Sequence, residues 1–204
     1  MCASVEDTLR ETLPMQSFRV LSNKLDAHVR PFDRTVMTSL QVIGGALFLA
    51  LCSHISISLW FTPVPLTLQV LGVLFVGALL GPWRGTAAVL TYLGAAVLGL
   101  PVLALNFAGP LAFMRPSSGY LFGFVLGAFI MGFLVQNLRL RGFAALTCAG
   151  IVSTAAIYAI GLPWLAQFVG SRQVFEFGLY PFAGVDTIKI LVVAASLRAM
   201  GDRL

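Results

Sequence analysis

The chain has 204 residues, of which 58% are hydrophobic and only 10% are charged. A soluble domain typically has about 25% charged residues, so the composition excludes that class. Lipid allows only helices or closed barrels to span it, and a barrel would alternate polar and apolar residues over stretches of about ten. The apolar runs here are continuous and about 20 residues long, which predicts an all-α polytopic membrane protein.

The net charge of +5 does not indicate nucleic-acid binding, because the basic residues lie in short segments between apolar runs, as in membrane proteins. Cys2, Cys52 and Cys148 lack metal-ligand spacing, so we expect neither a metal site nor a disulfide framework. No Ser/His pairing, zinc-protease or phosphate-loop pattern occurs. We therefore do not expect an enzyme, and active transport would need energy from a partner or a gradient.

Residues 1–34 are polar, with positive and negative charges in balance. No apolar stretch follows the start of the chain as it would in a secretory signal. We expect a cytoplasmic N-terminal tail over residues 1–34 and a transmembrane domain over residues 35–204.

Six apolar stretches follow the tail. The connector at Pro63 and Pro65 breaks the first from the second, and the tight turn at 81–85 separates the second from the third. The predicted transmembrane helices are Val36–Leu59, Leu66–Leu80, Thr86–Leu100, Gly119–Leu138, Phe143–Gly161 (continued by an apolar, interfacial segment over Leu162–Gly170) and Phe182–Met200.

Small residues recur at four-residue spacing in two of these stretches. Gly119, Gly123 and Gly127 form a stripe along which another helix is expected to pack closely. Ala46 and Ala50 have the same spacing in the first span. Their spacing alone leaves two alternatives open, helix packing within this chain and docking of an external partner.

The segment from Pro101 to Ser118 is long for a connector. It carries Asn106 and Arg115 among apolar residues, whereas a solvated loop would be more polar. We interpret it either as a flap over a cavity or as a loop that dips into the membrane interface.

Six spans would place both termini on the same side of the membrane. An excess of Lys and Arg marks the cytoplasmic side, so both termini are predicted to be cytoplasmic. The other side would hold only Arg115 and Arg172, while the cytoplasmic side would hold Arg10, Arg19, Lys24, Arg30, Arg34, Arg84, Arg139, Arg141, Arg198 and Arg203.

Asp186 and Lys189 lie within the sixth span, about 8 Å and 12 Å below its outer end at 1.5 Å per residue. Their spacing of three puts them on one helix face. A single charge at mid-bilayer costs about 3 kcal/mol, so the two residues need each other, water or a polar ligand. A site for a small polar or zwitterionic solute and a purely structural ion pair both remain open.

Five motifs occur in order along the chain, namely Val64-Pro65-Leu66-Thr67-Leu68-Gln69, Leu80-Gly81-Pro82, Tyr92 with Gly99-Leu100-Pro101-Val102, Pro116-x-x-Gly119-Tyr120-Leu121 and Asp186-x-x-Lys189. This ordered set resembles the BioY family, whose members are the biotin-binding S-components of energy-coupling factor (ECF) transporters. The departures are Val185, where the family usually has Gly, Leu103, where Phe is common, and Ser117-Ser118 within the fourth motif.

The resemblance implies a six-helix protein of the cell (inner) membrane that captures biotin (vitamin B7) from outside with high affinity. Its implied partners are a transmembrane T-component and two cytoplasmic ATPases, which would hydrolyse ATP in place of this chain. Whether the chain also transports alone is left open. In this family small residues of the first helix dock the T-component, which favours a docking role for Ala46 and Ala50.

The same resemblance assigns a biotin site to Asp186 and Lys189. Biotin offers two ureido N–H donors, a carbonyl acceptor and a carboxylate, so Asp186 can accept a hydrogen bond from it and Lys189 can donate one. Further candidates are Asn106, Gln69 and Tyr92 for hydrogen bonds, Arg115 for the carboxylate, and Phe107, Phe113 and Phe182 for apolar walls. Two other hypotheses are an S-component for a different vitamin and a structural membrane protein without a ligand.

Overall fold

The computed structural model describes the backbone of residues 15–201 and the side chains of residues 35–201. The chain forms two compact units, residues 1–40 and residues 41–204, and the larger unit contains both Asp186 and Lys189. The cytoplasmic tail predicted for residues 1–34 lies outside the described side chains, and it stays a prediction.

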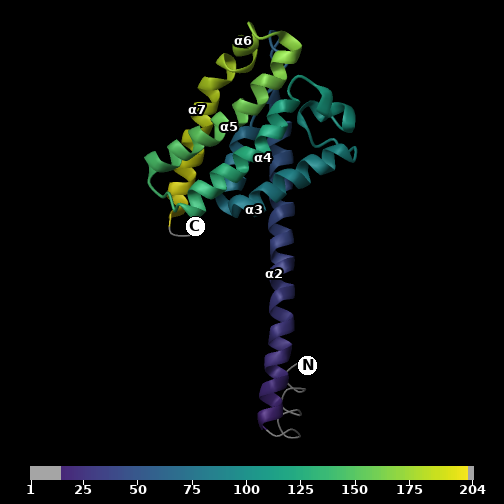
Figure 1. Ribbon diagram of the computed structural model, residues 1–204, viewed down its shortest axis with the longest axis vertical. Helices are drawn as coiled ribbons and strands as arrows, with labels where there is room; N and C mark the ends of the chain where they lie inside the picture. Colours follow the sequence, from purple (N-terminus) through teal and green to yellow (C-terminus); the bar gives the residue numbers. More distant parts are fainter. Residues whose placement is uncertain (1–14, 202–204) are drawn as a thin grey trace. The chain divides into compact units, whose positions relative to one another are not determined.

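The chain is mostly helical, and it contains one short two-stranded sheet (Figure 1). Among the described residues, five stretches are helical, long and apolar enough to cross a membrane, namely Thr35–His54, Gln69–Val97, Ser118–Asn137, Phe143–Val169 and Val174–Met200. The elements in chain order are α2 (Met15–His54), β1 (Ser56–Ile57), β2 (Leu66–Thr67), α3 (Gln69–Val97), the 3-10 turns η1 (Ala104–Asn106) and η2 (Pro110–Met114), α4 (Ser118–Gly132), the π-helical turn η3 (Phe133–Asn137), α5 (Phe143–Val169), α6 (Val174–Gly178) and α7 (Tyr180–Met200).

The helix α3 is broken at Gly81, where φ is 82° and the backbone leaves the helical conformation. Only glycine adopts this conformation without strain, and Pro82 follows it. The two arms of α3 fold back on each other, because Gly77 approaches Gly85 and the Gln69 amide reaches the Tyr92 hydroxyl at 2.6 Å. The break coincides with the predicted turn between the second and third spans, so each arm corresponds to one predicted span.

The first predicted span extends too far, because helix α2 ends at His54 rather than at Leu59. The next residues instead form β1, which pairs antiparallel with β2 through Ser56 with Thr67 and Ile57 with Leu66. Ile55 and Ile57 alternate with serines, a period of two that suits a strand. Because of this hairpin, α3 begins at Gln69 rather than at Leu66, the predicted start of the second span. The hairpin also adds two short strands to the predicted all-α fold.

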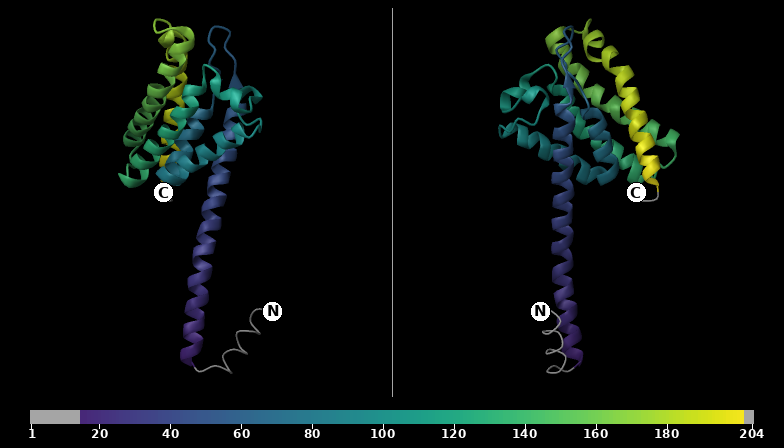
Figure 2. Two further views of the ribbon diagram at one scale, coloured as in Figure 1. Left: turned by 45° about the vertical axis from the view of Figure 1, so that its right-hand side comes forward. Right: turned by 180° about the vertical axis from the view of Figure 1, so that it is seen from behind.

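The helix α4 lies between α3 and α5, and α7 packs against α5 (Figure 2). The predicted glycine stripe is confirmed as a packing surface of α4. A Cβ atom at Gly123 would lie 2.7 Å from the Ile157 carbonyl oxygen, and one at Gly127 would lie 2.7 Å from the Ile157 side chain. The missing side chains let α4 and α5 approach to backbone contact.

Ala46 is only 8% exposed and belongs to the main core of the larger unit, while Ala50 is half-buried against that core. Packing within the chain, one of the two alternatives that their spacing allowed, therefore occurs at both alanines. The neighbouring face of α2 is exposed at Ile43, Leu47 and Leu51. A docking role for Ala46 and Ala50 stays a prediction.

Candidate functional site

A cavity lies inside the larger unit, between α3, α4, α5, α7 and the loop that follows α3. About 70 Å³ of it is open to the centres of water-sized molecules, and about 750 Å³ lies between its walls when the part open to solvent is counted. The first figure is well below the roughly 300–1,000 Å³ of sites for drug-sized ligands, so the cavity of this structure is narrow. Its lining is Val64, Pro65, Thr67, Gln69, Val70, Leu103, Ala104, Phe107, Ala112, Arg115, Ser117, Tyr120, Leu121, Phe124, Thr154, Ile157, Tyr158, Phe182, Asp186 and Lys189.

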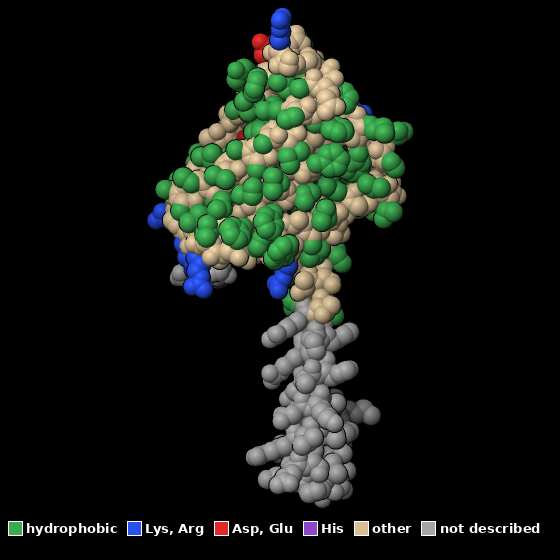
Figure 3. Space-filling view, viewed as in Figure 1, with side chains coloured by type: hydrophobic (Ala, Val, Ile, Leu, Met, Phe, Trp, Pro, Cys, Tyr) green, Lys and Arg blue, Asp and Glu red, His purple; other side chains and the backbone are tan. Residues whose placement is uncertain are grey.

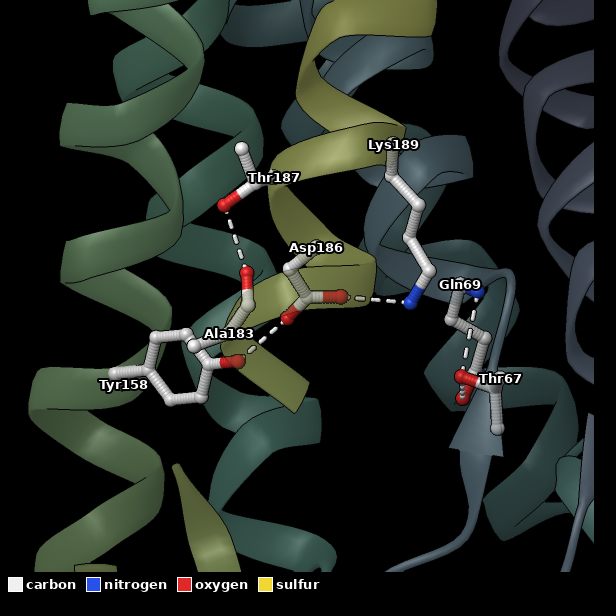
Figure 4. A network of polar contacts seen from close by, with 7 residues as sticks. All are labelled: Thr67, Gln69, Tyr158, Ala183, Asp186, Thr187 and Lys189. Atoms are coloured by element: carbon white, nitrogen blue, oxygen red, sulfur yellow. Dashed lines mark hydrogen bonds and ion pairs between the residues drawn. The ribbon is translucent and has the colours of Figure 1, made fainter. Parts of the chain in front are cut away.

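Asp186 and Lys189 face the cavity as a pair. Lys189 Nζ donates to Asp186 Oδ1 at 2.6 Å, and the Tyr158 hydroxyl donates to Asp186 Oδ2 at 2.5 Å (Figure 4). Asp186 is 5% exposed and Lys189 is 4% exposed, so both charged groups are removed from bulk solvent. Each carboxylate oxygen thus has one donor, which offsets part of the cost of burying the charge.

The start of α7 sets the position of this pair. Pro181 occupies the first turn of α7, where a missing backbone N–H costs nothing. From there the helical period turns Phe182, Asp186 and Lys189 toward the same side, and all three line the cavity. The side chains predicted to share a face therefore do so.

A second polar group faces the cavity from α3. Gln69 Oε1 accepts a hydrogen bond from the Thr67 hydroxyl at 3.3 Å, and Gln69 Nε2 donates to the Tyr92 hydroxyl at 2.6 Å. In the view of Figure 4, Thr67 and Gln69 lie on the side of the Lys189 ammonium group away from Asp186. Lys189 has three N–H donors and Asp186 is its partner among the described residues, so two donors remain for a polar ligand.

The loop of residues 98–117 covers part of the cavity and contributes Leu103, Ala104, Phe107, Ala112 and Arg115 to its wall. Of the two interpretations of this loop, the structure shows the one in which it covers a cavity. The Arg115 guanidinium lies 3.5 Å above the centre of the Phe107 ring, and it is exposed. Trp164 Nε1 donates to the Arg115 carbonyl oxygen at 2.9 Å and thereby ties the loop to α5.

Thr154 on α5 also faces the cavity. Its hydroxyl oxygen is buried and, among the described residues, has no hydrogen-bond partner. A hydroxyl in an apolar site without a partner is costly, which makes such groups rare in folded proteins. Thr154 lies four residues before Tyr158, so the two residues share one face of α5.

Of the seven residues predicted to bind biotin, Asp186, Lys189, Gln69, Arg115 and Phe107 line the cavity. Tyr92 lies behind Gln69, to which it is hydrogen bonded, and Asn106 is exposed in the loop outside the lining. Of the three predicted wall residues, Phe182 lines the cavity with Phe107, whereas Phe113 does not.

The sequence interpretation missed Tyr158 and Thr154. A pair of polar residues at four-residue spacing within an apolar span was the signal that could have identified them.

Comparison with known proteins shows similarity to the BioY family along most of the chain. Residues 23–204 match the BioY family. A biotin transporter BioY of Thermotoga maritima is 38% identical over 159 residues, which cover 76% of this chain and 91% of the relative. A biotin transporter BioY of Rhizobium etli is 37% identical over 172 residues, covering 79% of this chain and 90% of that relative.

The fold is also similar to that of a solved structure, the S-component for biotin from an ECF-type ABC transporter. The TM-score is 0.77 at 25% sequence identity, and the match covers 84% of this chain and 94% of the other. A family match over residues 23–204, together with relatives of this identity and coverage, leads to one conclusion: this chain is a multi-pass membrane protein of the BioY family.

Proposed function

We propose that this protein takes up biotin, capturing it with high affinity from outside the cell as the S-component of an ECF-type transporter. The observation that carries the proposal is the cavity, in which apolar walls surround the buried set Asp186, Lys189 and Tyr158. The family supports the ligand, since the relatives are biotin transporters and the structural neighbour is a biotin S-component.

The polar groups of the cavity match the ureido ring of biotin. Asp186 can accept a ureido N–H, because each of its oxygens has a second lone pair beyond those used by Tyr158 and Lys189. Lys189 and the Thr154 hydroxyl can donate to the ureido carbonyl. Phe107, Phe124 and Phe182 supply apolar contact for the fused rings. Gln69, held by Tyr92, is a further hydrogen-bonding group.

The carboxylate of biotin is assigned to Arg115, which is exposed where the loop meets the cavity. An exposed guanidinium keeps its hydration and meets the charged end of the ligand near the entrance, whereas the buried pair is already neutral in sum. Asn106, exposed in the same loop, is a candidate for contacts at this end. Biotin methyl ester should therefore bind the wild-type protein more weakly than biotin, and Arg115→Gln should remove that difference.

We propose that the chain crosses the membrane six times, with each arm of α3 as one crossing. The arms of 12 and 16 residues on either side of Gly81 are about 18 Å and 24 Å long at 1.5 Å per residue. They are shorter than the roughly 30 Å of a hydrocarbon core, so the turn at Gly81 would lie inside the headgroup boundary. The Gln136 amide donates to the Ala78 and Leu79 carbonyl oxygens beside this turn, which lowers the cost of placing it there.

Both termini are proposed to be cytoplasmic, in the cell (inner) membrane. Arg84 follows the turn of α3, Arg139 and Arg141 follow α4, and Arg198 ends α7. Arg115 and Arg172 lie in the loops at the other ends of these helices. The excess of arginine on one side supports that side as cytoplasmic and opens the cavity to the outside.

A T-component and two ATPases are the proposed partners. The ATPases would supply the energy for transport, because this chain has no nucleotide-binding motif in its sequence. Ala46 and Ala50 pack inward, so docking along α2 would bring a partner onto the exposed neighbours Leu47 and Leu51, which are 62% and 68% exposed. Replacing Leu47 by Trp should then reduce co-purification with the T-component and leave biotin binding intact.

The test of function is direct binding. Purified protein should bind biotin tightly in calorimetric titration, and Asp186→Asn or Lys189→Ala should weaken that binding sharply. In a thermal-shift screen of biotin, dethiobiotin, thiamine and riboflavin, biotin should give the largest shift. A shift for another vitamin without one for biotin would support an S-component of different specificity. Loss of stability in both variants without any ligand effect in the wild type would instead support a purely structural ion pair.

Uptake of labelled biotin separates capture from transport. Cells that contain this chain alone should be compared with cells that also contain a T-component and its ATPases. We expect fast uptake only with the full set. Equal uptake by the chain alone would overturn the dependence on these partners.

A further inference from the structure

The segment that joins β1 to β2, residues 58–65, carries two exposed aromatic side chains. Trp60 is 95% exposed and Phe61 is 40% exposed, and their ring centres lie 5.5 Å apart with the rings edge to face. In the described part of the chain, no acceptor forms a hydrogen bond with the Trp60 indole N–H. Tryptophan is highly buried on average in folded proteins. The fold itself therefore leaves Trp60 almost without contacts.

The opposite side of this segment is packed and hydrogen bonded. The Thr62 hydroxyl donates to the Phe177 carbonyl oxygen of α6 at 2.7 Å and accepts from the Val64 N–H at 3.2 Å. Thr62 and Val64 are both buried, and Leu59 packs against the core of the larger unit. Because one side of the segment is held in this way, the exposure of the aromatic pair is a fixed feature of the fold.

The hairpin around this segment has no charged residue, since residues 55–68 contain neither Asp, Glu, Lys nor Arg. A hairpin that stands in water normally carries charges, which also protect its edges from pairing with another chain. Ile55 and Ile57, each 60% exposed, precede the aromatic pair instead. Exposed apolar patches of this kind mark interaction sites. The composition therefore favours contact with a partly apolar surface over contact with water alone.

The depth of the segment in the membrane follows from the helices next to it. The span Thr35–His54 has 20 residues, or about 30 Å at 1.5 Å each, which matches a hydrocarbon core. β1 starts two residues later, and so it begins at the boundary of that core. Arg172 and Glu176 are exposed just before and within α6, the helix to which Thr62 is bonded. The aromatic pair thus lies where charged and apolar groups meet.

The surface of the larger unit supports this depth. The face in Figure 3 is covered mainly by hydrophobic side chains, and most of its blue side chains lie at its lower end. The segment lies at the opposite end, beside α6 (Figures 1 and 2). Tyr180, the first residue of α7, follows α6 and is 69% exposed. Trp and Tyr are enriched where acyl chains meet headgroups, because each ring is apolar and carries one polar atom.

From these features, the structure assigns residues 58–65 to the headgroup region of the bilayer, as an anchor whose partner is the lipid surface. The rings of Trp60 and Phe61 contact the upper acyl carbons, and the indole N–H donates to ester or phosphate oxygens of the lipid. The segment ends in Val64 and Pro65, which line the cavity that contains Asp186. The anchor therefore holds one wall of that cavity at the membrane surface. This assignment depends on the position of the chain in the membrane and not on its ligand.

Tryptophan fluorescence tests the contact in the full chain, reconstituted in phosphatidylcholine bilayers. Lipids brominated on upper acyl carbons quench tryptophans near the headgroups, lipids brominated near the chain ends quench those at the bilayer centre, and iodide quenches those in water. The wild type minus Trp60→Phe gives the emission of Trp60. We expect this emission to be blue-shifted from that of free N-acetyltryptophanamide, to be lost most with upper-chain bromines, and to be protected from iodide.

The double variant Trp83→Phe/Trp164→Phe leaves Trp60 as the one tryptophan and gives the same quantity directly, so the test does not depend on a single variant. Trp164→Phe is the matched control for the subtraction. Trp164 is half-buried and its indole N–H already donates to the Arg115 carbonyl oxygen, so its emission should respond less to upper-chain bromines than that of Trp60.

Three results would overturn the proposal. Quenching of Trp60 by iodide as strong as that of N-acetyltryptophanamide, without an effect of brominated lipid, would place the segment in water. Strongest quenching by bromines near the chain ends would place it inside the hydrocarbon core. Protection from both kinds of quencher would mean that another protein, or a second copy of this chain, covers Trp60.

Discussion

Near the start of α7, Asp186 and Lys189 are buried and neutralise each other, whereas near its end Arg198 is exposed and shares a cavity with Arg139 and Arg141. Both regions place charge beside apolar side chains within one helix of 21 residues. They differ in access to water. A buried charge needs a fixed partner, while an exposed arginine at the membrane boundary keeps part of its hydration.

This difference predicts where substitutions act. At the buried pair, loss of one group leaves the other charge without a partner, so stability and ligand binding should both change. At the exposed arginines, stability should change little. Measuring the stability of variants in the two regions therefore distinguishes a buried charged pair from exposed arginines.

Lys189→Met should have the largest effect. It leaves the Asp186 carboxylate buried with Tyr158 as its remaining donor, and breaking a buried pair in this way costs about 3–5 kcal/mol. Thermal unfolding without ligand measures the loss. Arg198→Met, in the last turn of the same helix, is the control and should stay within about 0.5 kcal/mol of the wild type.

A double variant, Asp186→Asn with Lys189→Met, removes both charges and should regain most of that stability without regaining biotin binding. If it bound biotin as tightly as the wild type, the pair would be structural only, and the proposed ligand contacts would be wrong.

Tyr158→Phe should have the next largest effect. It removes the hydrogen bond to Asp186 Oδ2, and a hydrogen bond to a charged group contributes about 1.5–3 kcal/mol. Both the unfolding temperature and the biotin affinity should fall. Tyr180→Phe, at a side chain that is 69% exposed, provides the comparison and should alter neither quantity. An unchanged biotin affinity in Tyr158→Phe would mean that Asp186 does not depend on this hydroxyl for its position.

The sequence predicted a large part of this fold for physical reasons that are local. Hydrophobic runs identified the helices, the glycine and proline at 81–82 identified the break in α3, and the period of the helix placed Asp186 and Lys189 on one face. The motif set also led to the correct family. Each of these features except the motif set, which extends over residues 64–189, depends on neighbours within a few turns.

Features that depend on distant parts of the chain were not predicted. Tyr158 meets Asp186 across 28 positions, and helical periodicity alone cannot pair two helices. The inward position of Ala46 also depends on distant residues. The spacing of small residues predicts that another helix approaches closely, but it does not predict which helix. The end of α2 at His54 was missed because a two-residue strand is too short to produce a clear alternation.

Gly123→Ala tests the scaffold that holds both regions in place. The added Cβ would lie 2.7 Å from the Ile157 carbonyl oxygen, which forces α4 away from α5. Overpacking of this kind costs about 1–3 kcal/mol. Gly94→Ala is the matched control, since a helical Cβ there meets nothing within 4 Å and should stabilise α3 by roughly 0.5–1 kcal/mol.

Chemical denaturation gives both values for the glycine variants. Equal losses for Gly123→Ala and Gly94→Ala would contradict the close packing of α4 on α5.

Thr154→Val should have the smallest effect. It is distinguished from the other changes because it should raise the stability of the ligand-free protein while lowering its affinity for biotin. Its hydroxyl is buried beside the cavity with no partner among the described residues, so the isosteric valine should raise the stability of the ligand-free protein by about 1 kcal/mol. The same change should lower biotin affinity by about 0.5–1.5 kcal/mol, the usual contribution of one hydrogen bond. Thr147→Val, whose hydroxyl donates to the Phe143 carbonyl oxygen on the same helix, should leave biotin affinity unchanged. Unfolding and titration of both variants decide the matter: a loss of ligand-free stability in Thr154→Val would mean that this hydroxyl serves the fold, whereas a gain coupled to weaker binding assigns it to the ligand.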